Sequence, residues 1–221
     1  MVEEAEAMTE RAGKMLAYVL QHAVEGDAAS VIRTADEYGY KYERMMHVGD
    51  MKGEIVREVV NELAPKVILE LGTYFGYSAV LIASVMPEGS RLLTVEFNEK
   101  NADVARQFIQ FAGVDDKVTL IVGDSARVIK RLHEDYSVKT LDFVFLDHWK
   151  DVYKRDLQLL EETRLLHKGT VILADNVIRP GAPEYLKYVE TSEWYQTERK
   201  YSKFQYTDED DALAKSVYFG P

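Results

Sequence analysis

The segment VILELGTYFG, residues Val67–Gly76, decides the fold of this 221-residue chain. Its first five residues form a short apolar run of the kind that is buried in a parallel strand. Gly72 and Gly76 follow, and glycines at this spacing allow a tight turn and close approach of the backbone to a ligand. Helical spacing over Tyr77–Met86 comes next, so the segment predicts a strand, a turn and a helix.

The same unit recurs along the chain. Further apolar runs lie at Leu92–Val95, Val118–Val122, Leu141–Leu146 and Thr170–Ala174, and further segments with helical spacing at Asn101–Ala112, Ser125–Tyr136 and Tyr153–Leu166. Repeated alternation of strand and helix predicts an α/β fold with a mostly parallel sheet. After Pro183 we expect one more helix, then two strands near Trp194–Tyr201 and Lys215–Phe219 that pair antiparallel at one edge.

The segment before the first strand is expected to be helical. Thr9, Asp27 and Asp50 are placed to cap successive helices, and Pro65 ends the last of them. We therefore expect a single domain over residues 1–221, in which N-terminal helices at about 9–63 cover the functional site.

The composition is that of an ordinary soluble protein, with 47% hydrophobic and 29% charged residues. The formal net charge of −11 makes nucleic acid a poor partner, because an acidic chain repels phosphate. The chain has no cysteine, which excludes disulfides, thiolate metal sites and a cysteine nucleophile. It also shows no signal peptide and no apolar stretch that could span a bilayer, so we expect a cytoplasmic protein, favoured as a monomer, that binds no membrane.

In such sheets ligands bind beyond the carboxyl ends of the strands. The turn at Gly72 and Gly76 matches neither a dinucleotide fingerprint nor a phosphate loop. It is either a turn that contacts another kind of ligand or a plain strand-to-helix turn. Glu96 ends the second run, 24 residues after Gly72, where a carboxylate is placed to accept hydrogen bonds from both ribose hydroxyls. The alternative is a solvated glutamate. Together the two features favour a nucleoside without a phosphate cradle, such as that of S-adenosylmethionine.

The third run ends in Gly123-Asp124-Ser125. Polar groups at this place can reach the edge of an adenine ring. They can equally cap the next helix, which is the simpler interpretation. The motif alone does not decide between the two.

The fourth and fifth runs end in acidic residues. Asp147 follows one run, and Asp175 and Asn176 follow the other, at strand ends that should be neighbours. Two carboxylates and an amide are hard oxygen ligands of the kind that suits Mg²⁺, although Asp147 or Asp151 could instead cap a helix. Lys150 is a candidate general base, because a lysine beside a divalent cation loses its proton more easily; otherwise it is a surface lysine.

The chain resembles the catechol O-methyltransferase family from about Ala17 to the C-terminus. The strings that carry the resemblance are HVGDMKG (47–53), LELGTY (69–74), GYSAV (76–80), RLLTVE (91–96), FLDHWKD (145–151), LADNV (173–177) and Pro180-Gly181. The resemblance implies a Rossmann-like class I methyltransferase. Its mostly parallel seven-stranded sheet would have helices on both faces and an antiparallel edge strand. The implied reaction moves a methyl group from S-adenosylmethionine to one hydroxyl of a catechol, chelated by Mg²⁺.

The resemblance also implies roles by position. It makes Asp147, Asp175 and Asn176 the Mg²⁺ ligands and Lys150 the general base. The expected cofactor pocket consists of Val48, Glu70, Gly72, Tyr74, Ser78, Glu96, Phe97, Gly123, Ser125, Asp147, His148 and Trp149. The expected acceptor pocket consists of Met46, Trp149, Lys150, Asn176, Pro180 and Gln205.

Some positions depart from the family's pattern. Arg44 stands where the family usually has a tryptophan, and Gln205 where it has a glutamate that bonds the second catechol hydroxyl. Phe97 and Ala126 differ from the residues expected around adenine. These departures leave open a related enzyme for a caffeoyl-type ester or another diphenol, and also a non-catalytic homologue that only binds the cofactor.

Overall fold

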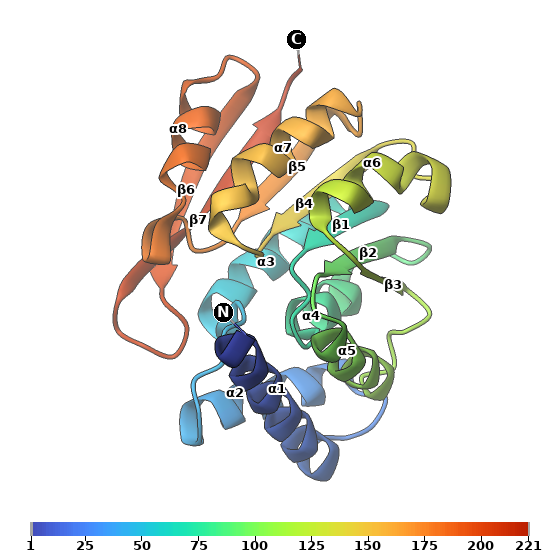
Figure 1. The fold of residues 1–221 in the computed structure, drawn as a ribbon, viewed down its shortest axis with the longest axis vertical. Helices are drawn as coiled ribbons and strands as arrows, with labels where there is room; N and C mark the ends of the chain where they lie inside the picture. Colours follow the sequence, from blue (N-terminus) through green and yellow to red (C-terminus); the bar gives the residue numbers. More distant parts are fainter. Residues whose placement is uncertain (1, 221) are drawn as a thin grey trace.

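The computed structural model describes residues 2–220, which form one seven-stranded sheet in the order β3-β2-β1-β4-β5-β7-β6 (Figure 1). The strands are β1 (Val67–Leu71), β2 (Arg91–Glu96), β3 (Val118–Val122), β4 (Leu141–Leu146), β5 (Leu166–Ala174), β6 (Tyr195–Lys203) and β7 (Asp210–Tyr218). Strands β1 to β5 pair parallel, which confirms the expected α/β fold. The strand order turns back on itself at β1, between β2 and β4, and this is the switch point of the sheet.

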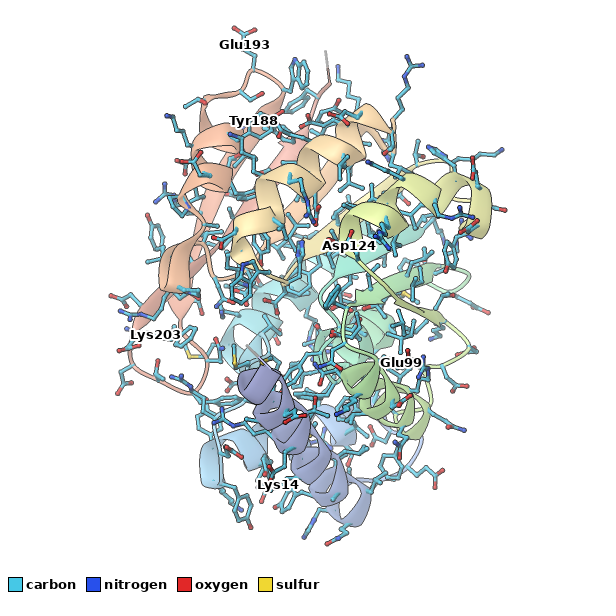
Figure 2. All side chains as sticks on the ribbon, viewed as in Figure 1. Lys14, Glu99, Asp124, Tyr188, Glu193 and Lys203 are labelled. Atoms are coloured by element: carbon cyan, nitrogen blue, oxygen red, sulfur yellow. The ribbon has the colours of Figure 1, made fainter. Side chains whose placement is uncertain are left out.

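The last two strands form the expected antiparallel pair at one edge. β7 runs antiparallel to both β5 and β6, so the reversed strand lies one position in from the edge and β6 is the edge strand. The hairpin between them carries residues 204–209 back toward the N-terminal part of the chain, with Lys203 at its base (Figure 2).

Helices lie on both faces of the sheet. Helices α1 (Val2–His22), α2 (Ala28–Lys41), α3 (Gly49–Leu63), α4 (Tyr77–Val85) and α5 (Glu99–Phe111) share one apolar core with one face. Helices α6 (Ser125–Tyr136), α7 (Tyr153–Glu162) and α8 (Pro183–Thr191) share a second core with the other face. Two short helical turns, η1 (Lys150–Val152) and η2 (Val177–Gly181), follow β4 and β5. Within residues 2–220, no helix is both long and apolar enough to cross a membrane.

The expected helix starts were only partly right. Asp27 caps α2 as predicted, since its carboxylate accepts from the backbone N–H of Ser30. Thr9 does not begin a helix, because α1 already starts at Val2 and the Thr9 hydroxyl donates to Asn101. Asp50 does not cap α3 either; it lies within the first turn and accepts from the hydroxyl of Tyr40. Both side chains look like caps in the sequence but hydrogen-bond to side chains of other helices, at 2.8 and 2.9 Å.

The segment after β4 also differs from expectation. The predicted helix Tyr153–Leu166 ends at Glu162, because Arg164 adopts a left-handed conformation and the chain then enters β5 at Leu166. Neither Asp147 nor Asp151 caps a helix, since the short turn η1 begins after Trp149 without a side-chain cap.

Candidate active site

The register of the central strands determines which residues leave the sheet side by side. Leu71 of β1 pairs with Leu146 of β4, and Leu146 pairs with Ala174 of β5. The next residue in each strand is Gly72, Asp147 or Asp175. These three therefore emerge together at the carboxyl edge, as the sequence predicted for the two acids.

Gly72 is required by this crowding. Its φ is +102°, and a Cβ placed on it would lie 2.5 Å from the backbone oxygen of Asp147. Any side chain would collide with the backbone that follows β4, so glycine is what allows the ends of β1 and β4 to lie this close together.

Glu96 lies at the end of β2 and is 8% exposed. One carboxylate oxygen accepts from the backbone N–H of Tyr74 at 2.8 Å, and the other accepts from that of Asn98 at 2.9 Å. Burial raises the pKa of Glu96, although these backbone donors oppose the rise. A carboxylate oxygen can accept more than one hydrogen bond, so a group of this kind at the end of β2 is suited to a diol.

Glu70 lies within β1 and is completely buried. The hydroxyl of Thr94, its partner across the β1–β2 ladder, donates to one carboxylate oxygen. The other oxygen has no hydrogen-bond partner among the described residues. Burial raises the pKa of Glu70 to about 7, against an ordinary value of 4.5. This Glu70 oxygen, which has no partner within the described part of the chain, is therefore suited to accept a hydrogen bond from a ligand.

A second orphaned atom belongs to His148. Its Nε2 lies 2.8 Å from buried Asp156, which also accepts from the Ser125 hydroxyl at 2.6 Å and from Arg155 at 2.7 Å. Because a carboxylate only accepts, Nε2 carries the proton and buried Nδ1 is left as an acceptor without a partner among the described residues. Burial lowers the pKa of His148, with Asp156 opposing it. Asp156 was not singled out from the sequence, because nothing local marks it.

Asp147 and Lys150 contact each other directly. The Lys150 ammonium donates to Asp147 at 2.9 Å and to the hydroxyl of Tyr153 at 2.8 Å. That hydroxyl in turn lies 2.8 Å from the backbone oxygen of Leu146 and 3.3 Å from that of Asp175. Buried Tyr153 therefore holds Lys150 against the ends of both β4 and β5.

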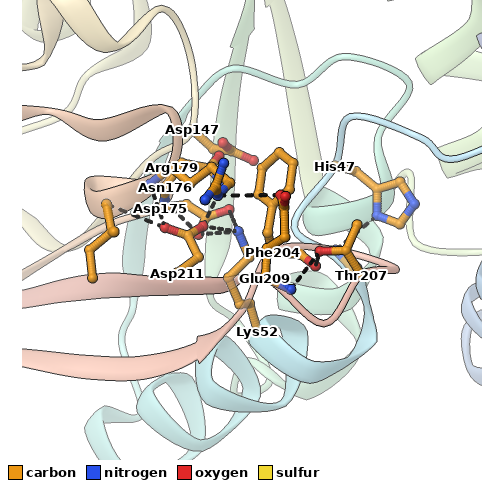
Figure 3. A network of polar contacts seen from close by, with 12 residues as sticks. His47, Lys52, Asp147, Asp175, Asn176, Arg179, Phe204, Thr207, Glu209 and Asp211 are labelled. Carbon is orange, nitrogen blue, oxygen red and sulfur yellow. Dashed lines mark hydrogen bonds and ion pairs between the residues drawn. The ribbon is translucent and has the colours of Figure 1, made fainter.

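On the other side of Asp175 lies a lysine that sequence reasoning missed. Lys52 of α3 is completely buried, and its ammonium lies 2.8 Å from Asp175 and 2.9 Å from Asp211 (Figure 3). We call Lys52, Asp147, Lys150, Asp175 and Asp211 the charged centre. Lys52 stands within the string HVGDMKG, but no local pattern showed that it would face acids more than 120 residues away.

Asp211 of β7 orients Asn176. The Nδ2 of Asn176 donates to Asp211 at 2.8 Å, and the backbone N–H of Arg179 donates to the same carboxylate at 3.0 Å. Because Asp211 can only accept, the Asn176 amide must present its nitrogen there and turn its oxygen away. The free Asn176 oxygen is then available as a ligand.

The pKa values in the charged centre follow from burial and pairing. Burial raises the pKa of Asp175 to about 6, although the Lys52 ammonium opposes the rise. Burial lowers the pKa of Lys52, but Asp175 and Asp211 outweigh it and the net shift is upward. For Asp211 the burial effect is outweighed by Lys52, and its pKa is lowered.

The charged centre could hold a divalent cation through oxygen atoms. No group of three or more His, Cys, Asp or Glu side chains in the described part of the chain could hold a metal ion. The donors at this place are two carboxylates, Asp147 and Asp175, with the amide oxygen of Asn176. Such a set fits a hard cation that keeps several positions for water and substrate, as Mg²⁺ does.

The remaining predicted residues fall into buried and exposed groups. Val48 and Ser78 are buried, and Phe97, Trp149, Met46 and Pro180 are exposed. Gln205 is 7% exposed, and its side-chain oxygen has no partner among the described residues. Its Cβ lies where a side chain on Gly49 would be, so the β6–β7 loop packs directly on the start of α3.

The sequence model of the O-methyltransferase family matches residues 26–193 of this chain. This chain belongs to the O-methyltransferase family. The membership makes it a methyltransferase enzyme and confirms the resemblance that the strings around Gly72, Asp147 and Asp175 indicated.

Among similar proteins, catechol O-methyltransferase B of Danio rerio is 50% identical, over 95% of this chain and 80% of its own length. Catechol O-methyltransferase of Bos taurus is 49% identical, over 94% of this chain and 76% of its own. A crystal structure of the O-methyltransferase TomG from Streptomyces achromogenes in complex with SAM is similar in fold. Its TM-score is 0.75 at 20% identity, covering 90% of this chain and 92% of that one.

Proposed function

We propose that this methyltransferase moves the methyl group of S-adenosylmethionine to one hydroxyl of a catechol, with Mg²⁺ held in the charged centre. The observation that carries the proposal is the convergence of Asp147, Lys150, Asp175 and Asn176 next to the turn at Gly72. About half of the residues are identical to those of catechol O-methyltransferases over nearly the whole chain, which supports the choice of acceptor.

The groups beyond β1 and β2 suit the cofactor. Glu96 would accept hydrogen bonds from the two ribose hydroxyls, and the orphaned oxygen of Glu70 would accept one from the cofactor's ammonium group. His148 offers its bare Nδ1 as an acceptor, while its Nε2 faces Asp156, which also binds Ser125. S-adenosylmethionine supplies a methyl group that is already electrophilic, because it is bonded to a positively charged sulfur.

The groups beyond β4 and β5 suit the acceptor. Mg²⁺ at Asp147, Asp175 and Asn176 would lower the pKa of the catechol hydroxyls bound to it. Lys150, held by Tyr153, would in its neutral amine form take the proton from the reacting hydroxyl. The oxygen would bond to the methyl carbon as the bond from that carbon to sulfur breaks, which would leave S-adenosylhomocysteine. Met46, Trp149 and Pro180 lie on exposed segments and would wall the ring, with the helices at 9–63 covering it.

Lys52 and Asp211 contribute by position in this proposal. Lys52 neutralises Asp175 while leaving lone pairs on its oxygens, and Asp211 fixes which atom of the Asn176 amide faces the cation. Neither residue needs to touch the substrate. A non-catalytic homologue would have no need of this arrangement, so the structure favours an active enzyme.

The test is an incubation of the protein with S-adenosylmethionine and unsubstituted catechol, with Mg²⁺ or with a chelator, and mass measurement of the products. We expect monomethylated catechol that disappears with chelator and returns when Mg²⁺ is added in excess. Product that is unaffected by chelator would reject the metal role, and the absence of product under any condition would reject the proposed acceptor.

A further inference from the structure

Arg44 is an exposed cation that is held in one place. It lies in the segment after α2, and its guanidinium carbon is 5.0 Å from the centre of the Phe204 ring. A guanidinium over an aromatic face is attracted by the electron-rich face of the ring. This contact restricts the guanidinium of Arg44 to a defined position.

Phe204 connects Arg44 with the charged centre. The ammonium of Lys52 lies 5.7 Å from the centre of the same ring, and Lys52 binds Asp175 at 2.8 Å. Figure 3 shows Phe204 and Lys52 in the same network as Asp175 and Asp211. Arg44 is thus connected to the proposed metal ligand Asp175 through two groups, the Phe204 ring and the Lys52 ammonium.

Arg44 differs from the neighbouring cations in having no acid of its own. Lys52 and Lys150 are paired with acids of the charged centre, and Arg179 lies 3.3 Å from Glu209. Arg44 forms no ion pair with any side chain that the structure describes, which are those of residues 6–220. The acid next to it in sequence, Glu43, is bound by Arg11 at 2.8 Å.

Gln205 adds the second feature. It follows Phe204 in the β6–β7 loop and is buried against Gly49, with a side-chain oxygen that has no partner among the described residues. That oxygen can accept a hydrogen bond from a hydroxyl. A carboxylate at this position would repel an anionic ligand and attract an ammonium group. The Gln205 amide is neutral and does neither.

We propose that the preferred acceptor is a catechol with a carboxylate on its side chain, and that Arg44 is the specificity-determining residue that binds this carboxylate. The fork of the guanidinium matches a carboxylate in two parallel hydrogen bonds. The inference rests on the proposed function and names the class of acceptor for the same site.

The test compares kcat/KM for three catechols that differ only in the ring substituent: carboxymethyl, ethyl or aminoethyl. We expect the anion to be preferred over the neutral compound by about fivefold, the upper range for an exposed ion pair, and the cation to be the poorest. The preference should shrink as KCl is raised, because salt screens an exposed charge pair.

Variants assign the preference to Arg44. Arg44→Gln should bring the ratio of anion to neutral compound close to one, and Gln205→Glu should shift preference toward the aminoethyl compound. Lys130→Gln is the control, since it removes the same unit of charge from exposed α6 on the opposite face of the sheet. An anion preference that persists in Arg44→Gln, or that falls equally in Lys130→Gln, overturns the inference.

Calorimetric titration with the carboxymethyl catechol, with Mg²⁺ and S-adenosylhomocysteine present, separates this inference from the proposed reaction. Binding that is weakened by Arg44→Gln, with no methylated product, would reject the reaction and keep the anion site. Methylation of the neutral catechol together with Arg44-independent binding of the anion would keep the reaction and overturn the anion site. No binding of the anion to the unaltered protein also overturns it.

Discussion

Two regions meet at the carboxyl edge of the sheet, and they are built differently. The β1–β2 region joins residues that are close in sequence: Tyr74 and Glu96 are 22 residues apart, and Glu70 and Thr94 are 24 apart. The charged centre joins Lys52 to acids 123 and 159 residues away. One strand-helix-strand unit, β1-α4-β2, specifies the first region, whereas the second exists only when α3, β5 and β7 have come together.

The two regions also handle charge differently. Glu70 and Glu96 are buried with neutral hydrogen-bond donors, so their carboxylates lack a cation in direct contact. In the charged centre each lysine contacts a carboxylate at 2.8 or 2.9 Å. The first region should therefore respond to pH and the second to removal of a partner. The following predictions test this contrast.

The largest effect is expected for the proposed base. Lys150→Ala should lower kcat by about 10²–10⁴-fold, because no other group is placed to take the proton, while the dissociation constant of S-adenosylmethionine changes little. Steady-state kinetics and calorimetry measure the two quantities. Lys154→Ala is the control on α7, since Lys154 lies 3.7 Å from Glu184 and outside the charged centre. Equal loss of turnover and cofactor binding would reject the role of Lys150.

Next comes the stability of the charged centre. Lys52→Met should lower the free energy of unfolding by about 3–5 kcal/mol, because it leaves Asp175 and Asp211 buried without their cation. Urea denaturation measures the change, with Lys100→Met as an exposed control. A variant as stable as the unaltered protein would show that this lysine is not needed to compensate the acids.

In the β1–β2 region the prediction concerns pH. The pKa of Glu70 is raised from 4.5 to about 7, so the folded cofactor-free protein holds a proton that the unfolded chain has released in this interval. Stability from this group is present below pH 4.5 and is lost as pH rises through 7. The unfolding free energy of Glu70→Gln, relative to the unaltered protein, should therefore rise by up to about 3 kcal/mol from pH 4.5 to pH 8.

Denaturation at several pH values checks this expectation. Asp211 of the charged centre provides the contrast, because Lys52 outweighs the effect of burial there and the pKa of Asp211 is lowered. A difference between the two proteins that does not vary with pH would mean that Glu70 titrates normally.

The smallest effect concerns a single hydrogen bond. Thr94→Val should cost about 1–2 kcal/mol of stability, because it removes the hydroxyl that donates to Glu70 and contacts Thr73 in the buried ladder. Thr119→Val on neighbouring β3 is the matched control, since that side chain is exposed and should change stability by less than about 0.5 kcal/mol. Equal effects of both substitutions would contradict the assigned hydrogen bond.

Much of the fold could be predicted because its signals are local. Apolar runs such as Leu141–Leu146 have few alternatives to a buried strand, and their alternation with helices fixes the direction of the strands. Caps were less predictable. Asp27 finds the backbone three residues on, but Thr9 and Asp50 look the same in sequence and bond distant side chains instead.

By itself, the sequence determined that Asp147 and Asp175 leave neighbouring strands at one edge, since each follows a buried parallel strand directly. Only the tertiary structure decided what surrounds them. Lys52, Asp211 and the stacking of Arg44 on Phe204 depend on how helices and a hairpin pack over that edge. A strand end is specified by its own residues, whereas contacts between distant segments are specified by the packing of the whole chain.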